Sequence, residues 1–427
     1  MNTLTLKLTA VLILSLITYL VSAQTNWYAV SSGTTQDLLS VDFINAGTGI
    51  IVGNSGMVLK TTNAGQSWLP VSTGFTNTFH AVQYIDNEKV IIAGSGGLIL
   101  YSTDGGNNWE VLQSGNQDYD IYDLAVDRVS GRGIAGGSGN SIIWSNDFGL
   151  TWTFVQGGYM NNFNCACMAN DQFGAVAGVN AIFQPLIGFT NNGGQSFDAQ
   201  PFYPTFNSTG YEGNSYACHF FDSNNGFIAG ALWDGQGFVT REVNWGSQFW
   251  DALAFNHPVF GIDFINQSKG VVVGGDFGAS TMIAETSDGG LSWQYANITG
   301  SGKTMRDVVL VDGTGYAVGL GGEILKREET IGYHQSHSKI LNINFHPNPV
   351  SDAGRLTVTL LNPAFVKIDI FNVYGQHLKN LHQGLLNEGT VTFDVETNNL
   401  RSGTYFMSVD DGNSKHNQKF IVLKKLQ

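Results

Sequence analysis

Three carboxylic acids, Glu212, Asp234 and Asp276, each stand next to an aromatic residue in a turn-rich segment of the chain. Two carboxyl groups held roughly 5–9.5 Å apart can cleave a glycosidic bond, one as general acid and the other as nucleophile or base. Nothing in the sequence brings two of the three together, and no zinc-protease, serine-hydrolase or phosphate-loop motif is present. We therefore assign no catalytic residue and keep these carboxylates for an alternative function, glycoside hydrolysis.

The same segments favour binding over catalysis. Aromatic rings beside carboxylates and amides suit stacking on sugar rings or the capture of a peptide. The alternative is that these side chains cover loops or pack between neighbouring strands. The candidate ligand-binding residues are His80, Tyr122, Tyr203, Tyr211, Tyr216, Trp233, Asp234, Asp276, Phe277 and Arg306. We expect no metal ion and no cofactor.

An internal repeat supplies the elements that would position these residues. An apolar run that ends in glycine recurs seven times, about 42 residues apart, and a period near 42 is typical of a four-stranded propeller blade. The glycines are Gly53, Gly94, Gly136, Gly178, Gly230, Gly274 and Gly319. Aligning the strand before each glycine places one residue per blade near the mouth of the central channel. These residues are Leu39, His80, Tyr122, Cys165, Tyr216, Phe260 and Arg306.

A second repeated pattern, Ser/Thr-x-Asp/Asn-x-Gly-x-x-Trp/Phe, follows five of these runs, and a degraded copy lies at 244–249. The acidic or amide residue can bond nearby backbone, and the glycines tolerate positive φ. We interpret the pattern as structural, since a catalytic group would not need six copies. Its residues are Asn63, Trp68, Asp104, Trp109, Asp147, Trp152, Asn192, Phe197, Asp288 and Trp293. The expected turns lie at the rim opposite the ligand site.

The seventh repeat is not followed by such a turn. A tryptophan-containing strand at 26–33 resembles the segment that comes after a turn but has no repeat before it. We predict that this N-terminal strand completes the last blade. The fold class is then all-β: a single seven-bladed propeller whose ring is closed by the N-terminal strand, followed by a small Ig-like β-sandwich. The alternating segments after 343 predict the sandwich.

These turns resemble the Asp boxes of BNR-repeat propellers. Together with the glycine-ended strands they are most similar to the photosystem II stability/assembly-factor-like family, over residues 27–327. The resemblance implies the propeller fold but no single function, because sialidases, xyloglucanases and sortilin-type receptors carry the same box. The sialidase arginine triad and the two-propeller cleft of xyloglucanases have no counterpart in this chain.

The C-terminal segment resembles the type IX (Por) secretion C-terminal sorting domain. The residues that carry this resemblance are Pro347, Asn348, Pro349, Gly375, Gly403, Tyr405 and Lys419. It implies a partner, the type IX secretion machinery, and a location: secreted or on the outer-membrane surface of a Gram-negative bacterium, reached through the periplasm. The alternative is an adhesive Ig-like domain without a sorting role.

We expect a signal peptide at 1–23, the propeller at 24–327, a linker at 328–342 and the sorting domain at 343–427. An uncleaved N-terminal anchor is the alternative for the first segment; after cleavage no transmembrane segment remains. The net charge of −14 makes nucleic acid an unsuitable partner. For Cys167 and Cys218 we expect free, buried thiols, because equivalent strands of neighbouring blades are usually too far apart for a disulfide.

The sequence thus favours a secreted or cell-surface propeller that binds a protein or glycan. A BNR-type glycoside hydrolase is the alternative, and an assembly factor for an extracytoplasmic complex is a further one.

Overall fold

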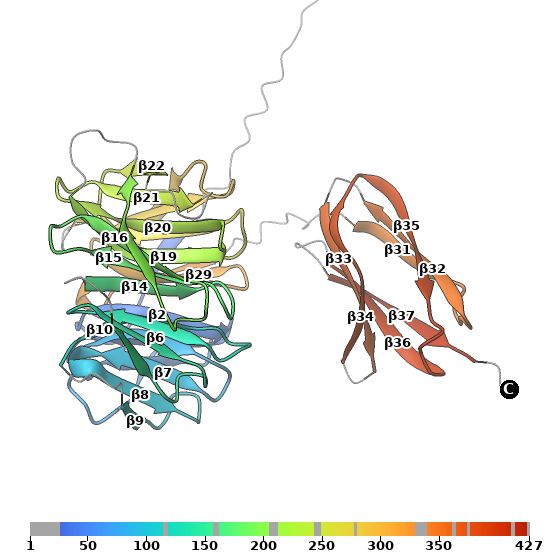
Figure 1. Cartoon of the computed structure of the whole chain (residues 1–427), viewed down its shortest axis with the longest axis horizontal. Coiled ribbons are helices and arrows are strands. Elements are labelled where there is room, and N and C mark those ends of the chain that lie inside the picture. Colours follow the sequence, from blue (N-terminus) through green and yellow to red (C-terminus); the bar gives the residue numbers. More distant parts are fainter. Residues whose placement is uncertain are drawn as a thin grey trace, which may run out of the picture. The chain divides into compact units, whose positions relative to one another are not determined.

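The computed structural model describes residues 26–113, 118–156, 162–204, 212–242, 249–276, 280–328, 340–360, 364–373, 376–410 and 415–424. The chain divides into two compact units, Met1–Glu329 and Thr330–Gln427 (Figure 1). Among the described residues, no helix is both long and apolar enough to cross a membrane.

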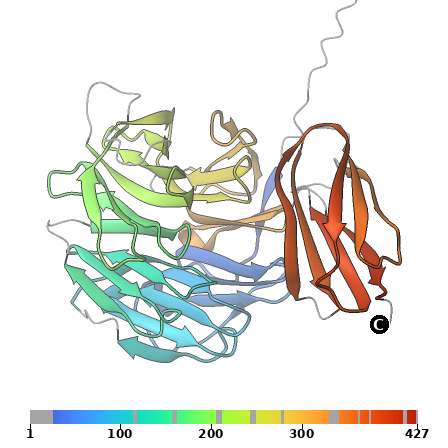
Figure 2. The ribbon, with the colours of Figure 1, turned by 45° about the vertical axis from the view of Figure 1, so that its right-hand side comes forward.

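The described part of the first unit contains seven sheets, numbered here along the chain (Figures 1 and 2). Sheet 1 holds β2 (Leu38–Asn45), β3 (Thr48–Gly53), β4 (Val58–Thr61) and β5 (Leu69–Pro70). Sheet 2 holds β6 (Phe79–Tyr84), β7 (Val90–Gly94), β8 (Leu98–Ser102) and β9 (Glu110–Gln113). Sheet 3 holds β10 (Ile121–Val126), β11 (Gly133–Gly137), β12 (Ser141–Ser145) and β13 (Thr153–Gln156). Sheet 4 holds β14 (Asn162–Met168), β15 (Gly174–Val179), β16 (Pro185–Thr190) and β17 (Asp198–Pro201).

The remaining three sheets follow the same antiparallel order, and two of them gain a fifth strand. Sheet 5 holds β19 (Gly213–Asp222), β20 (Asn225–Leu232), β21 (Gly237–Glu242), β22 (Phe249–Phe255) and the added β18 (Tyr203–Pro204). Sheet 6 holds β23 (Val259–Phe264), β24 (Gly270–Gly274), β25 (Met282–Thr286) and β26 (Gln294–Tyr295). Sheet 7 holds β28 (Met305–Val311), β29 (Thr314–Gly319), β30 (Ile324–Glu328), β1 (Asn26–Val30) and the added β27 (Asn297–Thr299). Three short 3-10 turns, η1 (Asn54–Gly56), η2 (Ser95–Gly97) and η3 (Leu320–Gly322), follow second strands.

The glycine at or near the end of each second strand has a steric cause. A Cβ atom on Gly53 would lie 2.0 Å from the carbonyl oxygen of Asp37, and one on Gly137 would lie 1.9 Å from that of Asp120. Each carbonyl belongs to the chain just before the first strand of the same sheet, so only glycine leaves room for it. In sheet 3 this residue is Gly137, not Gly136 as the repeat suggested. In the other five sheets a glycine of the second strand faces a carbonyl oxygen at the start of the first strand in the same way: Gly94, Gly178, Gly230, Gly274 and Gly319. Two of these strands, β15 and β20, continue beyond the glycine.

The first strands of consecutive sheets contact one another, and β28 contacts both β23 and β2. A side chain bridges each of these junctions, mostly by accepting a main-chain N–H of the next strand. The bridges join Asp307 to Val41, Asp42 to Tyr84, Gln83 to Val126, Asp123 to Ala166, Asn164 to Ser215, His219 to Asp263, and Asp263 to Leu310. Polar bonds therefore link all seven first strands in cyclic order.

The N-terminal strand β1 belongs to sheet 7. It pairs antiparallel with β30 from Trp27 to Val30, and parallel with β27. Trp27 is completely buried, and a Cβ atom on Gly315 would lie only 2.7 Å from its ring. Strand β1 therefore lies next to β30, in the position that the fourth strand occupies in the other sheets.

The repeated turns are held by their own side chains. Asp104 Oδ1 accepts hydrogen bonds from Ser102 Oγ and from the main-chain N–H groups of Asn107 and Asn108, at 2.8–2.9 Å. The Ser102 hydroxyl in turn accepts the N–H of Gly106 at 2.8 Å. The same arrangement recurs around Asn63, Asp147, Asn192 and Asp288. Trp68 and Trp152 are buried behind these turns, and Trp109, Phe197 and Trp293 are half-buried.

The second unit contains two sheets that share one core. One holds β31 (Ile340–His346), β32 (Ala353–Leu360) and β35 (Gly389–Glu396). The other holds β33 (Ala364–Asn372), β34 (His377–Leu386), β36 (Gly403–Asp410) and β37 (Lys415–Val422). Leu356, Val395, Ile368 and Met407 contribute to that core from both sheets.

Of the predicted sorting residues, Asn348 ties the segment between β31 and β32 to β37. Its side chain donates to the carbonyl oxygen of Lys419 and accepts the N–H of Ile421. Tyr405 donates its hydroxyl to Arg401 O at 2.9 Å, and its ring stacks on Phe420. Pro347, Pro349 and Lys419 are exposed, Gly403 begins β36, and Gly375 lies outside the described residues.

Candidate binding face

The first unit has two distinct ends. At one end, which we name the start face, the first strands begin and the second strands turn back; there Asn54 N–H donates to Asp37 O at 2.9 Å. At the other end, the turn face, the repeated turns lie against the turns between first and second strands, where Ala64 N–H donates to Gly47 O at 2.9 Å. The repeated turns and the strand starts therefore lie at opposite ends of each sheet.

Each first strand carries a β-bulge at its start. The bulge leaves one residue without a partner on the second strand, and such irregularities re-aim a side chain. The seven bulged residues are Leu39, His80, Tyr122, Asn164, Tyr216, Phe260 and Arg306. Six agree with the sequence alignment. In sheet 4 the bulged residue is Asn164, and Cys165 pairs with Ala177, so the alignment was wrong there by one residue.

Three of the bulged residues form one cluster. The Arg306 guanidinium lies over the ring of Phe260 at 4.5 Å, and Phe260 contacts Tyr216 with ring centroids 4.9 Å apart. Burial lowers the pKa of Arg306, although Tyr216 and Asp37 act in the opposite direction. Its Nε atom is buried and has no hydrogen-bond partner among the described residues. A buried donor without a partner is costly, so this cluster is suited to an acceptor supplied from outside.

Two further bulged residues form a second cluster. The rings of His80 and Tyr122 meet edge to face at 5.4 Å, and His80 Nε2 lies 3.1 Å from Ser95 Oγ. Burial lowers the pKa of His80, with Asp120 opposing it, and burial raises the pKa of Tyr122. A neutral imidazole and a neutral phenol provide hydrogen-bonding groups without charge.

The loops of sheets 4 and 5 place an aromatic pair on the same face. Phe183 and Trp233 are 52% and 62% exposed, and their ring centroids lie 4.8 Å apart. Main-chain bonds from Gly213 to Phe183 O and from Trp233 to Glu212 O hold the two loops together. With Ile182, also exposed, the two rings form what we name the aromatic platform. The sequence analysis selected Trp233 but left Phe183 and Ile182 out of the candidate ligand-binding residues, because the contact joins residues 50 positions apart.

The three candidate carboxylates have separate environments. Asp276 Oδ1 lies 2.9 Å from His257 Nδ1, which lowers the pKa of the carboxyl. Asp234 accepts the N–H of Gln236 in its own turn, and Glu212 is exposed. A carboxyl with a lowered pKa is a poor general acid at neutral pH. Within the described ranges, no group of three His, Cys, Asp or Glu residues could hold a metal ion.

Tyr211 and Phe277 lie outside the described residues, as does the degraded turn at 244–248. Tyr203 belongs to β18, which pairs parallel with β22. Strand β18 follows directly on β17, the last strand of sheet 4.

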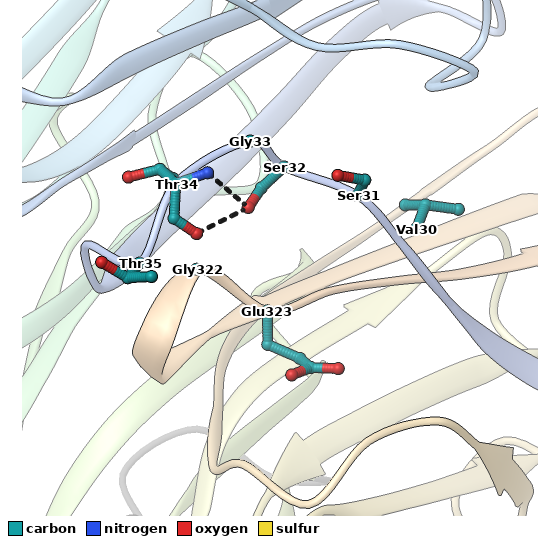
Figure 3. Close-up of a pocket in the computed structure, with 8 residues that line it drawn as sticks. All are labelled: Val30, Ser31, Ser32, Gly33, Thr34, Thr35, Gly322 and Glu323. Carbon is teal, nitrogen blue, oxygen red and sulfur yellow. Dashed lines mark hydrogen bonds between the residues drawn. The ribbon is translucent and has the colours of Figure 1, made fainter.

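An open pocket of about 560 Å³ also lies at the start face (Figure 3). The segment Val30–Thr35, which joins β1 to β2, forms one wall, and Gly322 and Glu323 form the other. Ser32 Oγ accepts the N–H of Thr34 at 3.3 Å, so part of the hydroxyl lining is already engaged. Burial raises the pKa of Glu323, opposed by Ser301 and Lys303. Polar groups dominate this pocket, unlike the aromatic platform.

Two family models match the sequence. Residues 20–118 match the model described as photosynthesis system II assembly factor YCF48. Residues 344–423 match the model described as secretion system C-terminal sorting domain. No curated protein matches the chain.

Solved propellers resemble the structure. YCF48 bound to D1 peptide has a TM-score of 0.56 at 16% identity, over 71% of this chain and 96% of that one. YCF48 from Cyanidioschyzon merolae gives 0.55 at 17%, over 71% and 98%. PorZ, described as an essential bacterial surface component of the type-IX secretion system of Porphyromonas gingivalis, gives 0.50 at 16%, over 88% of this chain and 58% of that one. At these identities the likeness shows the fold, an all-β propeller-like architecture.

Proposed function

We propose that this protein is a secreted or cell-surface propeller that binds a protein partner through its start face. The seven sheets act as seven blades of one ring, and β1 closes that ring as the outer strand of the last blade. The cyclic order of polar bridges between first strands supports this arrangement, as does the antiparallel pairing of β1 with β30. The second unit acts as an Ig-like sandwich.

The match to a sorting domain supports the proposed location outside the cell. The match of residues 344–423 to a sorting domain favours passage through the type IX system, with residues 1–23 as signal peptide and the second unit as the sorting signal. The exposed Pro347, Pro349 and Lys419 lie near one another through the bonds of Asn348 to β37 and would offer one surface to the secretion machinery.

The observation that carries the binding role is the aromatic platform. A soluble domain gains nothing from exposing Ile182, Phe183 and Trp233 side by side, and contiguous exposed apolar side chains mark interaction sites. The start face adds the buried Arg306 Nε that needs an acceptor, together with the neutral donors of His80 and Tyr122. Apolar anchors next to hydrogen-bonding groups suit a polypeptide segment, and YCF48, which shares the fold, has been solved with a peptide. A glycan that stacks on the platform is the alternative ligand.

A surface pull-down and a glycan array with the purified chain test this function. We expect the pull-down to recover a protein that Trp233→Ala no longer recovers, while Leu291→Ala at the turn face recovers it unchanged. Binding to glycans alone would mean that the ligand is a glycan and not a protein. An empty result in both assays, or equal recovery by both variants, would contradict the proposal.

A further inference from the structure

The three cysteines of the chain gather at the junction of sheets 4 and 5. Cys165 and Cys167 lie on β14 and face sheet 5, whereas Ala166 between them packs against sheet 3. Cys218 lies on β19 and faces sheet 4, whereas Ala217 packs against sheet 6. Because side chains alternate between the two faces of a strand, all three thiols point into the junction between sheets 4 and 5.

Two of the thiols converge on a single main-chain oxygen. Cys167 Sγ lies 3.8 Å from Ala175 O, and Cys218 Sγ lies 4.0 Å from the same atom. Cys165 Sγ lies 3.6 Å from Ala177 O and also contacts the Cys218 thiol. Burial raises the pKa of the Cys218 thiol well above its ordinary value, and contacts with the other two thiols add to this.

The backbones of β14 and β19 also approach closely. The Asn164 side chain, which extends only two bonds beyond Cβ, spans from β14 to Ser215 O of β19 at 2.9 Å. A disulfide needs Cα atoms within about 7 Å of each other, and a junction that asparagine can bridge is near this range. All three cysteines are free in the structure, as the sequence analysis expected for Cys167 and Cys218. The Asn164 bond shows, however, that the two strands lie closer than that expectation assumed.

We propose that Cys167 and Cys218 form a disulfide when the chain reaches an oxidising compartment, with Cys165 left as a thiol. Cys167 and Cys218 are half-buried residues, whereas Cys165 is buried, so the first two are the more accessible of the three to an oxidant. The oxidant is a small or protein disulfide. The thiolate of Cys167 attacks it and releases one thiol; the thiolate of Cys218 then displaces the second thiol from the mixed disulfide. Two protein thiols and one external disulfide give one protein disulfide and two external thiols, which carry the two protons.

The test oxidises the reduced, purified full chain with oxidised glutathione, denatures it, and counts iodoacetamide adducts by intact mass. We expect one adduct after oxidation and three after reduction, with a cross-linked peptide pair joining β14 to β19. Because the disulfide closes a loop of about 50 residues, the melting temperature of the oxidised form should rise by about 5 °C. Cys165→Ala is the matched control and should keep both the cross-link and the shift.

Cys218→Ala should retain glutathione on Cys167 and show no cross-link. Three adducts from the oxidised wild type would overturn the proposal, and so would a cross-link that Cys165→Ala abolishes. Wild-type and Cys165→Ala adduct counts decide the question even if the Cys218 variant fails to fold.

Discussion

The indole Nε1 of Trp27 donates a hydrogen bond to Glu285 Oε1 at 2.8 Å, which joins residues 258 positions apart. The other carboxylate oxygen of Glu285 meets Arg327 Nη1 at 3.1 Å, and the Arg327 guanidinium lies 5.9 Å from the Trp27 ring. Trp27 is thus held by sheet 6, through Glu285, and by β30, through Arg327. This relationship makes the N-terminal strand a structural part of the first unit.

Replacing Trp27 tests that role. Trp27→Ala should lower the free energy of unfolding by about 3–5 kcal/mol, because it empties a completely buried site and leaves Glu285 without this donor. Trp27→Phe keeps most of the packing and should lose less. Chemical denaturation of both variants measures the difference; an unchanged midpoint for Trp27→Ala would contradict the structural role of β1.

Two substitutions at Asp104 test how the repeated turn is held. Asp104→Ala removes the acceptor of two main-chain N–H groups and should cost about 1–2 kcal/mol. Asp104→Asn should cost less, since Asn63 and Asn192 accept the equivalent N–H groups in sheets 1 and 4. Thermal melts of the two variants should rank them in this order. Equal losses would mean that charge, and not acceptor geometry, holds the turn.

The pH dependence of stability and its change in Asp123→Asn test the bridges between first strands. Burial raises the pKa of Asp123 to about 7, and the nearby Asp307 carboxyl adds to this effect. A carboxyl whose pKa is higher in the folded state than in the unfolded chain stabilises the fold below its unfolded pKa, and this contribution is lost as pH rises through about 7. The free energy of unfolding should therefore fall between pH 5 and pH 8, and Asp123→Asn should make that fall shallower.

Asp288→Asn is the control for this pH dependence. The pKa of Asp288 is lowered by its hydrogen bonds to Ser292, so it stays ionised throughout the range from pH 5 to pH 8. Its replacement should shift stability evenly across that range. A slope unchanged in Asp123→Asn would show that the bridge carboxyl does not titrate there.

The second unit has its own test. Deletion of residues 342–427 should leave the first unit folded and cause it to accumulate in the periplasm, because the proposed sorting signal is gone. Fractionation with immunodetection measures this outcome. Unchanged surface export of the truncated chain would refute the sorting role.

Much of the fold could be predicted because the repeat has a local cause. The glycine at 53 is forced by an approaching carbonyl within the same sheet, and the turn around Asp104 is closed by residues within four positions. Both leave a pattern in the sequence. The match to propeller-like structures confirms the all-β, propeller-like architecture.

The site was harder to predict because its contacts are not local. The bulge in β14 could fall at Asn164 or Cys165 with equal hydrophobic pattern, and only the pairing with β15 decides. The contact of Phe183 with Trp233 depends on two loops that meet through main-chain bonds. Neither relationship leaves a spacing that a single sequence reveals.

The central claim is that a partner binds at the start face, and site-specific photo-crosslinking on intact cells tests it most directly. A benzophenone amino acid placed at Trp233 should give a discrete crosslinked adduct, whose partner mass spectrometry identifies. The same amino acid at Leu291, equally exposed at the turn face, should give none. An adduct from Leu291 alone, or the same adduct from both positions, would contradict the account.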